Sequence, residues 1–351
     1  MDQVWWGRVP NALAFTSDIT RNLLDGKSVI IQSEQSIPWY ETMAAHIKDI
    51  VIQQDYSKSF EVIRNVDDPG PYLLQEYCKA EKRAEYRPAK GYARFFAESD
   101  DIVLHTRYFW VYIESKETLV RWSEFVSEYR KLRGKNRETA VFILEMWGDK
   151  VSINKKGIRT VCYNDYINEY DRIVFSMLAS SGIKENAVIK NYLAELSATV
   201  SEADIELCAV CLAHYRDFLN DPYKLIQEIS VSSYRSNGAP FYYTRTNEEI
   251  SRYIWLAQIK TIYPLIEKFR GDFVDKYAEA IAKELPITSS YGEEYDDPKD
   301  VELGTLVFMA DRGRLLLSSS TYHRLERFKD ARNRLSHLGV LSFDEIQALI
   351  Q

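Results

Sequence analysis

The sequence lacks the features of membrane-spanning and secreted proteins. None of its 351 residues belongs to an apolar run that reaches the ~18 residues a membrane-spanning helix requires. Its first residues show no basic segment followed by an apolar one, so we expect no signal peptide. The four cysteines lack the spacing of a disulfide framework, which favours a reducing compartment. We therefore predict a cytoplasmic protein without a membrane contact.

The sequence also lacks an excess of positive charge. It contains 45 Lys and Arg against 52 Asp and Glu, which gives a net charge of −7. A protein that coats nucleic acid without specificity depends on a cationic surface, so this balance argues against that class but leaves room for a local basic cleft. An apolar content of 46%, with 24 Tyr and 7 Trp, is sufficient for sizeable cores.

The first half of the chain alternates between strand and helix patterns. Short runs rich in β-branched and aromatic residues predict strands at 27–32, 59–66, 102–114, 139–147 and 158–163. Between them, apolar residues recur at helical spacing in 36–51, 72–81 and 116–133, and 67–72 has the composition of a turn. This alternation predicts an α/β domain with a parallel sheet over residues 1–163, followed by all-α domains.

A phosphate-binding loop is missing where this order of elements would place one. The turn after the first strand contains neither glycine nor lysine, and Glu34 in it would repel phosphate. The triplet Gly26-Lys27-Ser28 precedes a strand, whereas the corresponding triplet of a phosphate loop opens a helix. We therefore expect weak or no ATP hydrolysis and no cofactor.

Two acids, Glu114 and Glu145, end apolar strands of this region. With these acids, the layout resembles the core of an AAA/STAND-type P-loop ATPase whose nucleotide loop has degenerated. The resemblance implies a sensor domain or a docking site for a protein partner rather than an active ATPase. An unrelated doubly wound domain is the alternative, because layout alone does not distinguish the two.

From residue 164 onward the pattern is helical. We predict a lid-like helical subdomain over 164–229 and a helical bundle over 240–351, in which Pro264 should kink or split a long helix. Cys208, Cys211 and His214 fall at i, i+3 and i+6 of one expected helix, 201–219. This spacing suits a metal, but a fourth ligand is lacking and buried thiols are the commoner case, so we predict no metal site.

A stretch near the end of the chain, residues 318–339, predicts one helix with Ser320 as N-cap and Gly339 as C-cap. Asn333 and His337, at i and i+4, share a face of this helix. Five residues correspond to about 500° of rotation, so Arg332 and His337 point roughly 140° apart. A site that uses both therefore needs a second helix, from the same chain or from a dimer.

The segment R-N-R-L-S-H, late in an all-helical domain, resembles the HEPN superfamily of helical bundles. The resemblance implies a metal-independent ribonuclease, of the kind found in bacterial anti-phage or toxin systems, with Arg332, Asn333 and His337 catalytic. It also implies RNA as substrate and a homodimer formed through the C-terminal bundle. Glu267 and Arg270, one turn apart in the expected helix 247–285, are candidates for a supporting role.

A non-enzymatic interpretation accounts for the same residues. Arg332 would pair with an acidic neighbour, His337 would pack near the helix end, and Glu267 and Arg270 would form a local ion pair. The protein would then be a scaffold subunit of a larger complex.

A second candidate for contact with RNA lies in residues 80–96, which are locally basic and contain aromatic side chains. Its cations could bind phosphates while tyrosines stack on bases; these cations are Lys82, Arg83, Arg87, Lys90 and Arg94. The alternative is an ordinary solvated surface.

Overall fold

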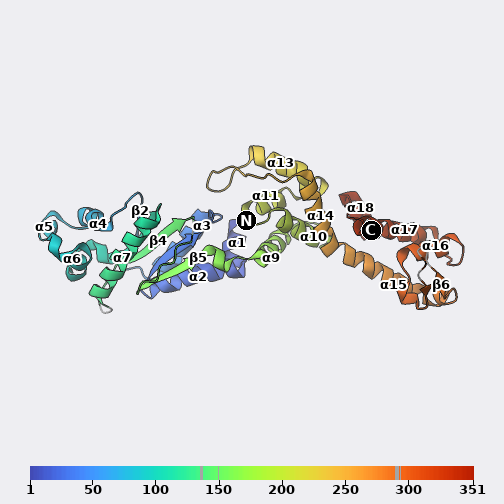
Figure 1. The fold of residues 1–351 in the computed structure, drawn as a ribbon, viewed down its shortest axis with the longest axis horizontal. Coiled ribbons are helices and arrows are strands. Elements are labelled where there is room, and N and C mark those ends of the chain that lie inside the picture. The colour runs from blue at the N-terminus through green and yellow to red at the C-terminus, as the bar shows by residue number, and fades with distance from the viewer. Residues whose placement is uncertain (135–136, 149, 289–291, 293) are drawn as a thin grey trace. The chain divides into compact units, whose positions relative to one another are not determined.

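The computed structural model describes residues 1–134, 137–148, 150–288, 292 and 294–351. The chain divides into two compact units, Met1–Asp171 and Arg172–Gln351, and Figure 1 labels most of their elements. Among the described residues, no helix is both long and apolar enough to cross a membrane.

The first unit is built on a five-stranded sheet with the order β2-β3-β4-β1-β5. All neighbouring strands are parallel, which confirms the predicted fold class of this part of the chain. The strands are β1 (Ser28–Ser33), β2 (Ser59–Ile63), β3 (Arg107–Ile113), β4 (Val141–Trp147) and β5 (Ile158–Cys162).

The three central strands form the core of this unit. Every residue of β1 is buried, as is every residue of β4 except Trp147. Strands covered by helices on both faces have such continuous apolar sequences, whereas the edge strand β2 has one buried residue, Ile63. In the register of the sheet, Glu145 of β4 lies beside Ile31 of β1 and Tyr112 of β3, so the carboxyl ends of these strands meet at one edge.

Helices connect the strands and cover the sheet (Figure 1). They are α1 (Asp2–Arg8), α2 (Pro10–Leu24), α3 (Tyr40–Gln54), α4 (Pro69–Tyr77), α5 (Ala80–Ala84), α6 (Tyr92–Glu98), α7 (Lys116–Arg133) and α8 (Tyr163–Tyr166), with 3₁₀ turns at Pro88–Lys90 and Val103–Thr106. The predicted apolar stripe of α7 is confirmed, because Leu119, Trp122 and Tyr129 are fully buried. Trp122 and Tyr129 lie against Phe142 of β4.

Two local predictions for this unit are wrong. Residues 67–72, expected as a turn, include the start of α4. Asp68 accepts a hydrogen bond from the Gly70 amide and Pro69 occupies the first helical turn, where its missing N–H costs nothing. The strand expected at 102–114 begins only at Arg107, because the residues before it form a 3₁₀ turn.

The second unit is mostly helical, as predicted. Its elements are α9 (Glu169–Ser180, which spans the division between the units), α10 (Ala187–Val200), α11 (Ile205–Ala213), α12 (Tyr215–Asn220), α13 (Pro222–Ser232), α14 (Asn247–Thr261), α15 (Tyr263–Ala282), α16 (Leu303–Asp311), α17 (Ser319–Ser336) and α18 (Phe343–Ile350), with the short strands β6 (Ile287–Thr288) and β7 (Glu294–Tyr295) and a 3₁₀ turn at Pro298–Asp300. The break expected at Pro264 is present between α14 and α15, whereas the single helix expected at 201–219 is two helices.

A buried glutamine connects segments of this unit that are distant in sequence. The Gln258 amide in α14 donates to the Leu341 carbonyl and accepts from the Leu341 amide, both at 2.8 Å. It also donates to the Tyr192 hydroxyl of α10 at 3.2 Å. Because Gln258 is fully buried, these bonds fix the segment that follows α17 against α10 and α14. The predicted boundary between residues 229 and 240 stays a prediction.

Candidate functional site at the carboxyl end of α17

The helix that carries the R-N-R-L-S-H segment is anchored along one face. Its N-cap is Ser318, whose hydroxyl accepts from the Thr321 amide, so the prediction of Ser320 is wrong. Leu325, Phe328, Ala331 and Leu335 are buried. Phe328 stacks on Phe269 of α15, with ring centroids 3.8 Å apart. These contacts fix the rotation of α17 and therefore the direction in which its polar residues point.

The carboxyl end of α17 closes with a Schellman motif. The Gly339 amide donates to the Arg334 carbonyl at 2.9 Å and the Leu338 amide to the Leu335 carbonyl at 3.3 Å. The left-handed residue is Leu338, at φ 61°, so the prediction that Gly339 takes this position is wrong. Gly339 is required for a different reason: a Cβ there would lie 2.6 Å from Cγ of Arg334.

This motif places His337 at the C-cap, directly after the last helical turn. The indole N–H of Trp255, on α14, donates to the Leu335 carbonyl at 2.8 Å and holds the helix end from the other side. The backbone around His337 is therefore constrained by hydrogen bonds on both sides, while its side chain stays exposed.

The three predicted catalytic residues have different environments. Asn333 and His337 are exposed and lie one turn apart, with the His337 amide donating to the Asn333 carbonyl at 3.2 Å. Neither side chain makes a hydrogen bond within the described part of the chain. Arg332 is instead half-buried, and its Nη2 donates to the Glu302 carboxylate at 2.8 Å. The structure thus brings Asn333 and His337 together and directs Arg332 elsewhere.

The supporting residues bind the same segment as Arg332. Glu267 and Arg270 form an ion pair within α15, at 2.9 Å, and Arg270 also donates to the Lys299 carbonyl at 2.7 Å. Arg332 reaches Glu302, three residues further along. Two arginines from α15 and α17 therefore hold the short segment that leads into α16. A role of Glu267 and Arg270 in catalysis stays a prediction.

The basic residues proposed for RNA contact have partners within the protein. Lys82 pairs with Glu85 at 2.6 Å, and Lys90 and Arg94 both approach Glu98, at 2.7 and 4.0 Å. Backbone carbonyls accept from Arg83 and Arg87. The two tyrosines of this stretch, Tyr86 and Tyr92, stack on each other with centroids 4.5 Å apart rather than presenting free faces. Their contact with RNA stays a prediction.

A buried carboxylate lies at the carboxyl edge of the sheet, where parallel α/β proteins bind their ligands. Glu145 of β4 accepts hydrogen bonds from the Tyr40 hydroxyl at 2.7 Å and from the Trp110 indole at 2.5 Å. The Tyr112 hydroxyl lies 2.7 Å from that of Tyr40, and the Arg64 guanidinium stacks 3.7 Å from the Tyr112 ring centroid. These residues form a continuous polar chain from Glu145 to the exposed Arg64.

Burial raises the pKa of Glu145, and the donors Tyr40 and Trp110 oppose that shift because they stabilise the ionised form. Burial and the neighbouring carboxylate also raise the pKa of Tyr40, which therefore acts as a hydrogen-bond donor. The sequence indicates the position of Glu145 at a strand end, but not its partners. Those come from α3 and β3, and no short spacing connects them.

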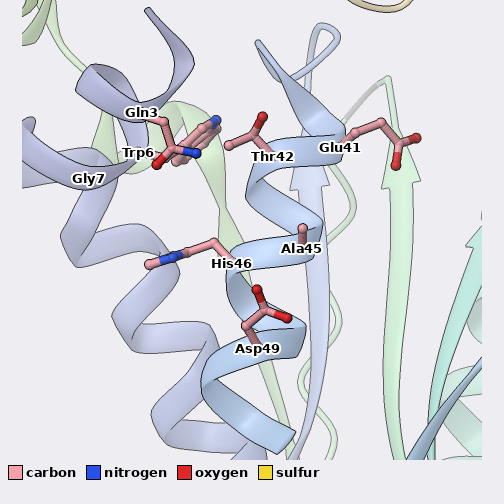
Figure 2. Close-up of a pocket in the computed structure, with 8 residues that line it drawn as sticks. All are labelled: Gln3, Trp6, Gly7, Glu41, Thr42, Ala45, His46 and Asp49. Carbon is pink, nitrogen blue, oxygen red and sulfur yellow. The ribbon is translucent and has the colours of Figure 1, made fainter. Parts of the chain in front are cut away.

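A pocket of about 460 Å³ lies between α1 and α3 (Figure 2). It is lined by Gln3, Trp6, Gly7, Glu41, Thr42, Ala45, His46 and Asp49. His46 and Asp49 are one turn apart on α3, a spacing that would suit acid–base chemistry. In Figure 2, however, His46 and Glu41 extend to opposite sides of α3. The titratable groups therefore do not converge on one point.

The Cys208, Cys211 and His214 spacing does not assemble a metal site. Cys208 and Cys211 are buried in α11, where the Cys208 thiol lies 3.1 Å from the Ser176 hydroxyl, while His214 is exposed at the C-cap. Burial raises the pKa of both thiols, so neither is predisposed to be a thiolate. Among the described residues, no group of three or more His, Cys, Asp or Glu side chains is placed to hold a metal ion.

Comparison with protein-family models gave no match to this chain, and comparison with curated protein sequences gave none either. The function therefore has to be argued from the geometry of the residues.

Proposed function

We propose that this protein is a metal-independent, HEPN-like ribonuclease whose site lies at the carboxyl end of α17. The observation that carries the proposal is the exposure of His337 and Asn333, side by side on a helix end that is itself held by Trp255 and by the Schellman motif. Catalytic groups are most effective when the backbone that supports them is rigid and the reacting atoms are open to substrate.

Cleavage of RNA without a metal needs three roles. A base removes the proton of the 2′-hydroxyl, whose oxygen attacks the adjacent phosphorus. An acid then protonates the departing 5′-oxygen, and a cation stabilises the negative charge of the pentacoordinate phosphorus. Histidine suits the first two roles because its ordinary titration range lies near neutral pH. We assign the role of base or acid to His337 and the stabilisation of the negative charge on phosphorus to Arg332. Asn333 would orient the substrate.

The ion pair with Glu302 restricts what Arg332 can do. It occupies one end of the guanidinium fork, and Nε is buried without a hydrogen-bond partner in the described part of the chain. An RNA phosphate would therefore have to share Arg332 with Glu302 or displace that carboxylate. A second copy of α17, in a homodimer formed through the C-terminal bundle, supplies the second histidine that the chemistry requires.

The proposal is tested by cleavage of a mixed-sequence RNA in the presence of EDTA. We expect His337→Ala to lose at least ~10²-fold in rate, the typical contribution of a general acid or base. The matched control is His323→Ala, on the first turns of the same helix, where the exposed imidazole pairs with Glu326 and contacts the Tyr322 ring. Rates that are equal for the wild type, His337→Ala and His323→Ala would contradict the proposal.

A non-enzymatic scaffold is the second candidate, and the ion pair between Arg332 and Glu302 favours it. That pair, with the pair of Glu267 and Arg270, fastens α15, α16 and α17 together, which is the structural role expected of a scaffold. In this interpretation the α/β unit, without a phosphate loop, docks a protein partner. The scaffold interpretation would be supported if the wild type cleaves no RNA and Arg332→Ala lowers the stability of the protein.

We propose that the protein acts in the cytoplasm, whether as a ribonuclease or as a scaffold. Its assignment to anti-phage defence rests on the family resemblance alone.

A further inference from the structure

A cationic pocket lies at the amino edge of the sheet, opposite to the edge where Glu145 is buried. Its volume is about 660 Å³, within the range of roughly 300–1,000 Å³ typical of small-molecule sites. It is enclosed by the residues before β1, the carboxyl end of α7 and the residues before β5. Four cations line it, namely Lys27, Arg130, Lys131 and Lys156, together with one carboxylate, Asp25.

Most of this charge is not neutralised within the protein. Asp25 pairs with Lys27 at 3.5 Å. The side chains of Arg130, Lys131 and Lys156 make no hydrogen bond or ion pair within the part of the chain that the structure describes. The protein as a whole carries a net charge of −7, so the charge of this pocket is opposite in sign to the net charge of the protein.

Two glycines position the arginine of this pocket. Gly26 and Gly157 have φ values of 68° and 86°, in the left-handed region that favours glycine. A Cβ on Gly26 would lie 3.3 Å from Nη2 of Arg130, and one on Gly157 would lie 3.2 Å from Cγ of the same side chain. The Arg130 side chain therefore lies closely across both backbones, which fixes it at the pocket wall.

The dipole of α7 explains only part of this arrangement. Cations in the last turn of a helix stabilise its partial negative charge, which accounts for Arg130 and Lys131. Lys27 and Lys156 belong to other segments, and their charges repel those two. Cations gathered from three segments around one cavity are typical of a site that binds an anion.

We propose that this pocket binds a phosphorylated small molecule about the size of a mononucleotide. The guanidinium of Arg130 offers the paired N–H donors that match phosphate oxygens, and the three lysines contribute point charges. The site is separate from the proposed ribonuclease site and does not depend on it. It is also not a degenerate phosphate loop, because it lies at the amino ends of the strands.

The test is isothermal titration of the full-length protein with pyrophosphate and with adenosine 5′-monophosphate. We expect both to bind the wild type, and Arg130→Gln to weaken binding roughly tenfold or more, as for the loss of a hydrogen bond to a charged group. The matched control is Arg121→Gln, which should bind like the wild type. Arg121 is exposed on α7, nine residues before Arg130 and so on the opposite face of the helix.

A second variant separates binding from folding. Lys156 is exposed, so Lys156→Gln should leave the melting temperature unchanged and still weaken binding several-fold. A competition experiment with a single-stranded RNA oligonucleotide tests whether the pocket binds a phosphorylated small molecule or the phosphates of RNA. The proposal is overturned if neither small molecule binds, if Lys156→Gln and Arg130→Gln bind them like the wild type, or if only the oligonucleotide binds.

Discussion

At the scale of single residues, His105 shows how a buried titratable group is fixed in one protonation state. Its Nε2 lies 2.6 Å from the Ser99 carbonyl, which can only accept, so Nε2 carries the proton. Its Nδ1 therefore accepts from the Tyr129 hydroxyl at 2.7 Å, and that hydroxyl accepts from the Ala140 amide at 3.1 Å. This chain of donors fits the neutral imidazole, in which Nε2 donates and Nδ1 accepts.

We predict from this chain that acid destabilises the protein through His105. Burial lowers the pKa of His105 in the folded state, and the Ser99 bond opposes that shift only in part. The unfolded chain therefore binds a proton first, near the ordinary histidine pKa of about 6.5. The contribution of His105 to stability is complete above that pH and is lost as pH falls towards the folded pKa, at up to about 1.4 kcal/mol per pH unit.

Urea unfolding between about pH 7.5 and pH 5.5 measures this effect. His105→Gln, whose amide can still donate to the Ser99 carbonyl, should be less stable near neutral pH but lose less stability on acidification. An equal pH dependence in the wild type and in His105→Gln would show that another group is responsible.

At the scale of secondary-structure elements, two substitutions at the end of α17 should change the stability of the protein in opposite directions. Leu338 adopts φ 61° while 72% exposed, so it has the strain of the left-handed region without gaining much burial. Leu338→Gly should therefore stabilise the protein, by about 1 kcal/mol. Gly339→Ala should destabilise it, because the new Cβ would lie 2.6 Å from Cγ and 3.1 Å from the carbonyl oxygen of Arg334.

Thermal or urea denaturation of the two variants checks this prediction. The order of stability should be Leu338→Gly, wild type, Gly339→Ala. The reverse order would mean that the helix end does not adopt the Schellman geometry, and with it that the position of His337 differs from the one described.

How much of this was predictable from the sequence also differs between elements. The strands and α7 were predictable because continuous apolar runs and a regular stripe both require burial on known faces. The adjacency of Asn333 and His337 followed from helical geometry. The pairing of Arg332 with Glu302 did not, since the two residues are thirty positions apart and the whole of α16 lies between them.

The cap residues of α17 show the limit of local rules. Ser318 and Ser320 are both competent N-caps by residue type, so the sequence does not distinguish them, and in the structure the helix begins after Ser318. Likewise, no motif connects Lys27, Arg130 and Lys156 in the sequence. They meet because the parallel sheet brings the starts of β1 and β5 to the end of α7.

At the scale of the whole molecule, the proposed chemistry requires more than one chain. The chain has a single histidine at the end of α17, whereas acid and base catalysis together need two proton-transferring groups. Arg332 is directed towards Glu302 and away from His337 of its own helix. In a two-fold dimer, however, the two copies of His337 can face the same phosphate, as each surface meets its own copy, and together they fill the roles of acid and base.

We predict from this arrangement that His337→Ala inactivates wild-type chains with which it pairs. After equal amounts of the two proteins are mixed under conditions of subunit exchange, half of the dimers contain one chain of each kind and therefore a single His337. Only the wild-type homodimers, a quarter of all dimers, keep both histidines, so activity should fall to about a quarter of that of the same amount of wild type. The matched control, an equal mixture of wild type and His323→Ala, should keep nearly full activity. If light scattering shows exchanged dimers and activity stays at about one half, the two histidines do not act at one site.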